Sequence, residues 1–432
     1  MTVKLIPIST QNTLPKSTSV VIIGGGIVGI SAALALAERN IPVVLLEKGY
    51  IAAEQSSRNL GWIRKTSRHV NDVPLAQAAD RIWAGMSERI GIDVGYRQSG
   101  IMFLAKTDEQ MAVYEKWLMS VKDLDLGSKI LNKRGIDKYV PGGNSDWKGA
   151  VYTASDGRAE PSMVTTALAK AAIEKGAILI QHCAVRDLVK SAGKVSGVIT
   201  ELGEIKCDQV LLAGGAWSRR FLGNVGLSLP TLPVIASVLR TKPIEGPTEI
   251  AVGGPDFSFR KHKDGGFIIM QRGKVDAPIT LDHLKIGLQF KEQLRFGKDA
   301  LNISFGKAFF QDLAMPRRWP SNKSSPFEAV RVRNPEINHE LLEDAINNVS
   351  KAWPVFRKAE IEESWAGLID VTPDSTPVID RIKAIPGLTI ATGFSGHGFG
   401  TGPAAGQLAA DMVLNDRLLV NPDAYRFDRF LN

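Results

Sequence analysis

Residues 20–47 read VVIIGGGIVGISAALALAERNIPVVLLE, and this stretch decides the fold. Val20–Ile23 is a short run of β-branched residues, which predicts a buried strand, and three glycines follow it directly. The segment Ile27–Arg39 is rich in alanine and leucine and predicts a helix that Asn40 can end. Ile41–Glu47 predicts a second strand. This order predicts a βαβ unit with parallel strands and a right-handed crossover.

The glycines between the first strand and the helix match the pattern G-x-G-x-x-G over Gly24–Gly29. Gly24 would permit the tight turn, Gly26 would let the backbone approach a pyrophosphate, and Gly29 would let the helix pack closely on the sheet. The helix N-terminus would offer unpaired N–H groups and a positive dipole end to the phosphates. Glu47 would accept hydrogen bonds from ribose hydroxyls and repel a 2′-phosphate. The motif predicts a dinucleotide site but leaves NAD and FAD open.

Two later segments favour FAD. Gln209–Trp217 (QVLLAGGAW) predicts a strand that completes the nucleotide-binding sheet and runs into a turn of small residues. A glycine-rich loop, Gly393–Gly402, precedes a helix predicted from Pro403 to Leu414. Such a loop can approach a flat ring closely, and the helix dipole would stabilise the negative charge of a reduced flavin.

The remaining chain predicts a second layer. Met163–Lys175 predicts an amphipathic helix, with strands at Ile178–Val185, Val195–Thr200 and Leu388–Ala391, whereas residues 237–349 alternate strands with loops and one or two helices. The predicted class is therefore α/β, a Rossmann-type FAD-binding domain interleaved with an α+β substrate domain built on a mixed or antiparallel sheet. The predicted FAD-binding domain comprises residues 1–90, 150–235 and 355–432, and the substrate-binding domain residues 91–149 and 236–354.

Composition narrows the class of protein further. The net charge of the 432 residues is +8, but the basic residues are dispersed among acids, which favours a solvated surface or a field for anionic substrates over a nucleic-acid groove. Two cysteines, Cys183 and Cys207, indicate a reducing compartment, and we expect the cytoplasm. The sequence shows no signal peptide, no stable membrane anchor, and no Cys/His spacing typical of a metal site.

Several segments together resemble a known superfamily. They are the fingerprint with Glu47, GRAEPSMVTTALAKAAIEKG at 157–176, LLAGGAWS at 211–218, and TPDSTPVI at 372–379 followed by GFSGHGFGTGP at 393–403. Over nearly the whole chain they resemble the D-amino-acid oxidase, sarcosine oxidase and glycine oxidase superfamily of flavoproteins. Further segments resemble its bacterial L-amino-acid oxidase and deaminase branch: IAAEQSSRNLG at 51–61, Asp146–Lys148, AGGAWSRRF at 213–221, PTLP at 230–233 and SPFE at 325–328.

This resemblance implies FAD-dependent oxidative deamination of L-amino acids to 2-oxo acids and ammonia. A D-amino-acid dehydrogenase, an N-methyl-amino-acid, glycine or sarcosine oxidase, and a non-catalytic flavin-binding protein remain open, as does assembly into a homo-oligomer. The implied FAD contacts are Gly24, Gly26, Ile27, Val28, Gly29, Glu47, Lys48, Gln55, Ser56, Ser57, Asn59, Leu60, Gly61, Val185, Ala213, Gly214, Trp217, Gly367, Gly393, Gly396, Gly398, Phe399, Gly400 and Thr401.

The sequence departs from the superfamily in two places. Sarcosine oxidases hold their flavin through a cysteine just before the TPD motif, where this chain reads Gly367–Asp370 without a cysteine, so we expect non-covalent FAD. The membrane-bound deaminases carry an N-terminal hydrophobic anchor that this chain lacks. With one dinucleotide fingerprint and no evident NAD(P)H site, the flavin would be reoxidised by O2, a quinone or a carrier protein. We expect O2, which would give hydrogen peroxide.

A fixed cation is needed for the substrate carboxylate, and arginine binds a carboxylate with two hydrogen bonds. The first candidate is Arg272, which aligns with the carboxylate-binding arginine of the L-deaminase branch. Strand alternation over Gly266–Gln271 would aim it at the flavin cavity. Arg64 is the second candidate. His397, between glycines, is interpreted as a structural or flavin-contacting residue and not as a base. The expected walls of the side-chain pocket are Trp62, Trp365 and Phe394.

Overall fold

A six-stranded sheet positions the fingerprint in the computed structural model, which describes residues 3–144, 146–292, 294 and 300–430. Its strand order is β20-β21-β12-β1-β2-β8, and all neighbours are parallel except β20 and β21. This is the parallel nucleotide-binding sheet expected of an α/β fold. The strands are β1 (Val20–Ile23), β2 (Val43–Leu46), β8 (Ile178–Ile180), β12 (Gln209–Leu212), β20 (Val378–Arg381) and β21 (Leu388–Thr392).

Strand β1 has both faces covered because its side chains alternate between two hydrophobic clusters. Val20 and Ile22 pack with the helices, whereas Val21 packs with the three-stranded sheet on the other side. The alternation places the fingerprint turn between helices and sheet. The helices are α1 (Ile27–Ala37), α2 (Val73–Ala84), α6 (Pro161–Glu174) and α13 (Gly398–Leu414), and the small sheet holds β9 (Val185–Ser191), β10 (Lys194–Thr200) and β11 (Gly203–Lys206).

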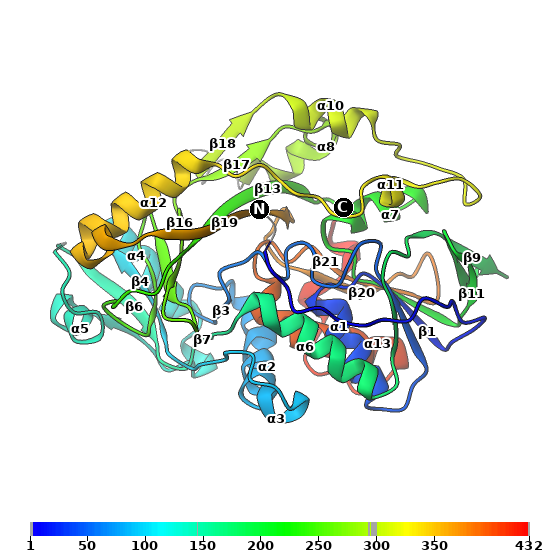
Figure 1. The fold of residues 1–432 in the computed structure, drawn as a ribbon, viewed down its shortest axis with the longest axis horizontal. Helices are drawn as coiled ribbons and strands as arrows, with labels where there is room; N and C mark the ends of the chain where they lie inside the picture. Colours follow the sequence, from blue (N-terminus) through cyan, green and yellow to red (C-terminus); the bar gives the residue numbers. More distant parts are fainter. Residues whose placement is uncertain (1–2, 145, 293, 295–299, 431–432) are drawn as a thin grey trace.

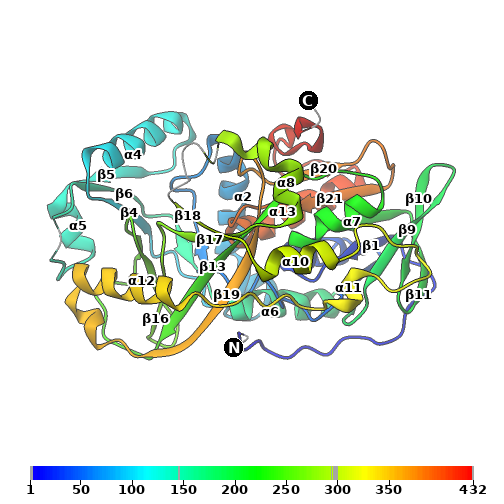
Figure 2. The ribbon, with the colours of Figure 1, turned by 90° about the horizontal axis from the view of Figure 1, so that it is seen from above.

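A second, ten-stranded mixed sheet forms the other layer. Its long strands β13 (Leu232–Thr241) and β19 (Ile361–Val371) pair antiparallel, and α12 (His339–Ala352) packs on it. This layer and the small sheet β9–β11 lie at opposite ends of the molecule (Figures 1 and 2). The other strands are β4 (Ile101–Ala105), β5 (Ser128–Leu131), β6 (Gly149–Thr153), β14 (Ala251–Gly253), β15 (Ser258–Lys261), β16 (Phe267–Met270), β17 (Val275–Pro278) and β18 (Leu301–Ser304).

Strands of this large sheet extend past the predicted domain limits. A limit between residues 235 and 236 divides β13, and β6 and β19 belong to the large sheet although residues 150–235 and 355–432 were assigned to the FAD layer. The physical reason is that β13 and β19 continue without a break from the large sheet toward the six-stranded sheet. No helix in the described residues is long and apolar enough to cross a membrane.

One helix starts five residues earlier than the sequence predicts. Helix α13 begins at Gly398, so Pro403 lies inside it and the glycine-rich loop is limited to 393–397. The early start follows from tertiary packing. A Cβ on Gly402 would meet Ile27 at 2.8 Å, and a Cβ on Gly406 would meet Ser31 and Val28 at 2.6 Å. These glycines let α13 lie directly against α1, which offsets their poor helix propensity.

Candidate active site

The fingerprint turn forms because its glycines are packed from both sides. Gly24 has φ +115°, and a Cβ there would lie 2.4 Å from the Ala213 carbonyl oxygen at the end of β12. A Cβ on Gly29 would lie 2.1 Å from the Gly24 carbonyl oxygen. Gly26 precedes α1 without any side-chain cap, and the Ile27 N–H donates to Ser56 Oγ at 2.9 Å. The N-terminus of α1 therefore faces the neighbouring cavity, as an anion site requires.

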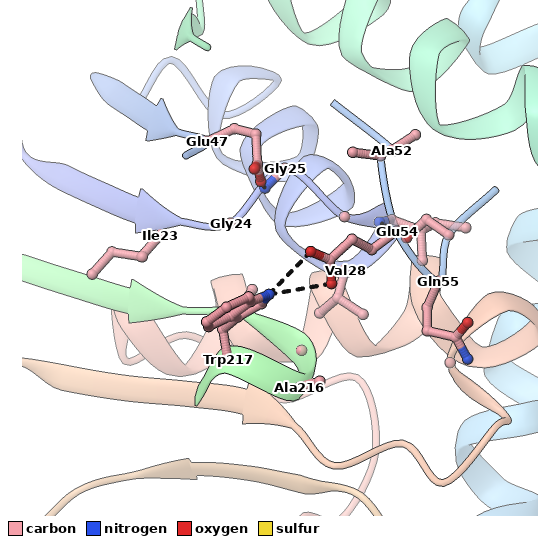
Figure 3. Close-up of a pocket in the computed structure, with 18 of the residues that line it drawn as sticks. Ile23, Gly24, Gly25, Val28, Glu47, Ala52, Glu54, Gln55, Ala216 and Trp217 are labelled. Atoms are coloured by element: carbon pink, nitrogen blue, oxygen red, sulfur yellow. Dashed lines mark hydrogen bonds between the residues drawn. The ribbon is translucent and has the colours of Figure 1, made fainter. Parts of the chain in front are cut away.

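Glu47 is fixed at the end of β2 beside this turn (Figure 3). Its carboxylate accepts hydrogen bonds from the Gly25 N–H and the Gly49 N–H, both at 2.7 Å. Burial raises the pKa of Glu47, and the two backbone donors and the adjacent Lys48 oppose that rise. The carboxylate thus lies where a ribose would meet the sheet.

A cavity begins at this turn and has an empty volume of about 1270 Å³, its opening to solvent included. It runs from Glu47 past α1 to the aromatic side chains of Phe394 and Phe399. A phosphate-binding end joined to an apolar, glycine-lined end fits a long cofactor with a dinucleotide and a flat ring. The predicted FAD contacts that line it are Gly24, Gly26, Ile27, Val28, Glu47, Lys48, Gln55, Ser56, Asn59, Val185, Ala213, Gly214, Trp217, Gly396, Gly398 and Phe399.

Two of the other predicted contacts, Gly367 and Gly400, pack behind the wall of the cavity. A Cβ on Gly367 would meet Gln55 Oε1 at 2.2 Å, so this glycine makes room for a side chain that lines the cavity. A Cβ on Gly400 would lie 3.0 Å from the Trp62 carbonyl oxygen, so the glycine lets α13 pack closely on β3 (Trp62–Ile63). The contacts predicted but absent from the lining are Gly29, Ser57, Leu60, Gly61, Gly367, Gly393, Gly400 and Thr401.

Two acidic residues of the lining were missed by the sequence analysis. The first, Glu54, accepts hydrogen bonds from the Trp217 indole N–H at 3.0 and 3.2 Å (Figure 3). It also accepts one from the backbone N–H of Arg333 at 3.0 Å. The Lys48 ammonium and the Arg333 guanidinium lie 4.1 and 4.3 Å from the Trp217 ring centroid. Glu54 lies in the segment 51–61 that carries the resemblance, but its partner Arg333 is distant in sequence, so no local pattern indicated it.

The second missed acid, Asp370, ends β19 at the flat-ring end of the cavity. Its carboxylate accepts a hydrogen bond from the Gly393 N–H at 2.9 Å, and its carbonyl oxygen accepts one from the Ser395 N–H at 3.0 Å. Burial raises the pKa of Asp370 to about 6. Asp370 therefore holds the turn that leads into α13 against the cavity.

Beyond the turn lies a cluster of aromatic and basic side chains. The guanidinium carbons of Arg272 and Arg64 lie 4.2 and 5.4 Å from the ring centroid of Phe103, and the Trp62 ring meets the same ring edge-on at 5.5 Å. Arg64 Nη2 lies 3.0 Å from His397 Nε2, and His397 stands between two glycines that line the cavity. The structure thus brings Arg272, Arg64 and Trp62 together beside the cavity.

Arg272 does not reach this cluster by strand alternation, which corrects the prediction. Strand β16 ends at Met270, and Arg272 lies in the turn that follows. Its direction is set by a hydrogen bond from Nη1 to the Gly254 carbonyl oxygen at 2.9 Å and by stacking on Phe103. The side chain is therefore fixed by tertiary contacts with β4 and the chain after β14.

His397 is a neutral donor in this arrangement. Burial, together with the charges of Arg68 and Arg64, lowers the pKa of His397 well below its ordinary value. Since the Arg64 guanidinium can only donate, Nε2 accepts, and the ring proton resides on Nδ1. Nδ1 is buried and has no hydrogen-bond partner among the described residues. Such a histidine suits contact with a ligand better than proton abstraction.

Of the other two predicted wall residues, one lines the cavity and one does not. Phe394 is buried and lines the cavity. Trp365 is buried in a cluster with Val238 and Ile268, and its indole N–H donates to the Arg58 carbonyl oxygen at 3.0 Å. It is absent from the cavity lining and packs behind the site.

Neither cysteine lies near the flat-ring end. Cys183 lines the cavity near Glu47, and burial raises its pKa to about 11, so it is a thiol at neutral pH. The segment just before the TPD motif, Gly367–Asp370, contains no cysteine. Within the described ranges no group of three or more His, Cys, Asp or Glu side chains could hold a metal ion.

Comparisons with known proteins agree with this geometry. The family model for FAD dependent oxidoreductases matches residues 19–412. The mitochondrial sarcosine dehydrogenase of Mus musculus is 24% identical over 433 residues, covering 98% of this chain and 42% of its own length, so this chain spans less than half of that relative. The glycine oxidase of Bacillus subtilis is 25% identical over 421 residues, covering 95% of this chain and 96% of its own.

A solved structure is closer in fold and in sequence. The L-amino acid deaminase of Proteus myxofaciens, solved in complex with anthranilate, is 34% identical with a TM-score of 0.95, covering 99% of this chain and 96% of its own. It shares the Rossmann-type sheet interleaved with a mixed substrate sheet. Because the family model spans most of the chain and the cavity has a nucleotide end and a flat-ring end, the chain belongs to the FAD-dependent oxidoreductases of the DAO family, and FAD is its cofactor.

Proposed function

We propose that this enzyme catalyses the oxidative deamination of L-amino acids to 2-oxo acids and ammonia. The observation that carries the proposal is the guanidinium of Arg272, stacked on Phe103 beside the cavity with no carboxylate at ion-pair distance in the described part of the chain. A half-buried cation without a carboxylate partner suits the carboxylate of a substrate. The likeness to the Proteus myxofaciens deaminase favours the L-amino-acid class.

The chain's own residues supply orientation and a dry site. Arg272 would hold the α-carboxylate in a fixed plane, and Trp62 and Phe103 would exclude water from the α-carbon. Bound FAD supplies the two-electron acceptor that takes the α-hydrogen as hydride from the neutral amine. The amino acid thereby becomes an imine, which water hydrolyses to the 2-oxo acid and ammonia. Neutral His397 would donate its Nδ1 hydrogen to a ligand and would not act as a base.

We further propose that O2 receives the two electrons together with two protons, giving hydrogen peroxide, and that the enzyme works in the cytoplasm. The single dinucleotide fingerprint, which leaves no evident NAD(P)H site, supports O2 as the acceptor. The two free cysteines support the cytoplasm. The second candidate is a D-amino-acid dehydrogenase or a glycine- or sarcosine-type oxidase. The relatives named above, which are 24 and 25% identical to the chain over the aligned residues, favour the glycine and sarcosine types of this candidate.

Anaerobic flavin spectroscopy tests the proposal. The purified enzyme is mixed with L-amino acids, their D-isomers, glycine and sarcosine, and the visible absorbance of the oxidised flavin is followed. We expect bleaching by L-isomers, followed by recovery and peroxide formation when air is admitted. Bleaching by D-isomers or sarcosine alone would assign the second candidate. A yellow protein that none of these compounds bleaches would be a non-catalytic flavin-binding protein.

A further inference from the structure

Two arginines share one aromatic ring at the substrate end of the site. The guanidinium carbons of Arg272 and Arg64 lie 4.2 and 5.4 Å from the centroid of Phe103, so they are no farther apart than the sum of these distances. Neither side chain forms an ion pair with a carboxylate of the described residues. Two cations therefore share one ring without a counter-ion from the part of the chain that the structure describes.

Of the four buried arginines among the described residues, three pair with carboxylates, whereas Arg58 meets carbonyl oxygens and the side chain of Asn334. Arg68 pairs with Asp72, and Arg260 forms a two-fold contact with Glu160 at 2.8 Å. Arg158 also pairs with acids. A buried guanidinium that lacks a carboxylate is costly, because desolvation is not repaid by an opposite charge. Burial first, and the like charges of Arg68 and Arg272 next, lower the pKa of Arg64 to about 9.

Both guanidinium groups keep donors for a ligand. Each carries five N–H groups. Arg272 uses Nη1 for the Gly254 carbonyl oxygen, and Arg64 uses Nη1 for the Thr66 carbonyl oxygen and Nη2 for His397. These contacts fix the two planes and leave N–H groups on each that meet no acceptor among the described residues. The pair is therefore built for anions, and the α-carboxylate of an ordinary amino acid would neutralise only one of the two.

We propose that the substrate is an L-amino acid with a second carboxylate in its side chain, of the aspartate or glutamate class. Arg272 binds the α-carboxylate and Arg64 binds the side-chain carboxylate. The net charge of +8 attracts such a substrate, whose two carboxylates outweigh its single ammonium group. This inference rests on the proposed function and names its substrate class.

Isosteric substrate pairs test the inference directly. Glutamate and glutamine differ in charge but hardly in shape, as do aspartate and asparagine. We expect the wild-type enzyme to reduce its flavin at least about 30-fold more efficiently with the acid than with the amide, the factor that a desolvated charge pair contributes. Equal efficiency within a pair, or preference for the amide, would overturn the inference while leaving amino-acid oxidation in place.

The variant Arg64→Gln should lose this preference. We expect its apparent Kd for glutamate to rise at least about 30-fold and its Kd for glutamine to change less than about 3-fold. An equal loss of affinity for both substrates would show that Arg64 binds the α-carboxylate. No loss of affinity for either substrate would show that Arg64 only balances the negative charge of the cofactor. Both results overturn the inference. Arg97→Gln, which removes an exposed arginine and the same charge, is the matched control and should behave as wild type.

A binding measurement separates this inference from the proposed reaction. Glutarate and butyrate differ by one carboxylate and cannot be deaminated, so calorimetric titration of the FAD-loaded protein reads the anion site without turnover. We expect glutarate to bind more tightly than butyrate, and Arg64→Gln to remove the difference. If the glutamine variant loses its FAD, Arg64→Lys takes its place. This variant keeps the charge and should retain part of the difference in affinity between glutarate and butyrate. Equal binding of the two acids by wild type overturns the dicarboxylate site, even if L-amino acids bleach the flavin.

Discussion

At the scale of single residues, Arg272 is the side chain on which substrate binding is expected to depend. Replacing Arg272 by Ala removes the cation over Phe103 and should raise KM for amino acids about 100-fold. FAD content should stay unchanged, because Arg272 does not line the cofactor cavity. Steady-state kinetics with flavin absorbance per protein checks both. Arg272→Lys, which keeps the charge but loses the planar fork, should lie between, and an unchanged KM in Arg272→Ala would remove the residue from the site.

At the scale of elements, the turn before α13 is tied to β19 through the Asp370 carboxylate. The folded pKa of about 6 lies above the ordinary value of 3.8, so the folded protein holds this proton more tightly than the unfolded chain. The charge on Asp370 therefore lowers stability as pH rises from the unfolded to the folded pKa, and the penalty is complete above the folded value. Asp370→Asn cannot ionise and escapes this penalty.

The free energy of unfolding of Asp370→Asn, relative to wild type, should thus rise by about 2 to 3 kcal/mol between about pH 4 and about pH 7. Urea denaturation across that pH range measures the unfolding free energy of both proteins. Subtracting the wild-type value from that of the variant cancels the contributions of the other titrating groups. Parallel stability curves for the two proteins would show that Asp370 does not titrate in this window.

At the scale of the whole molecule, a buried ion pair joins the two layers. Arg260 on β15 meets Glu160, which precedes α6, through two hydrogen bonds of 2.8 Å, and both side chains are at most 1% exposed. Burial raises the pKa of Glu160, but Arg260, His262 and Arg158 outweigh it and hold the pKa below its usual range. The charge of Glu160 is therefore stabilised by residues of the other layer.

Replacing Arg260 by Met leaves this carboxylate buried with weaker partners and should cost about 3 kcal/mol of unfolding free energy. The double variant Arg260→Met/Glu160→Gln, which also removes the charge, should recover part of the loss. Lys242→Met breaks an exposed pair with Glu360 and serves as the control, with a change below about 1 kcal/mol. A similar loss in both single variants, measured by chemical denaturation, would contradict this account.

The sequence by itself determined the nucleotide end of the protein. Strand, glycine turn, helix and acidic strand end are neighbours in the chain, so hydrophobic periodicity and the conformational needs of Gly24 predict β1, α1 and Glu47 with little ambiguity. The resemblance to the amino-acid oxidases then predicted FAD and 16 of the 33 residues that line the cavity.

Only the tertiary structure decided the start of α13 and the composition of the substrate end. Gly402 is compatible with a helix because α1 packs against it, and Trp365, a plausible wall residue in the sequence, is buried behind the site. Glu54 and Asp370 line the cavity through contacts with residues far along the chain. Arg64 and Arg272 meet on Phe103 although about 200 residues separate them, and such meetings depend on sheet pairing and packing, which local sequence periodicity does not encode.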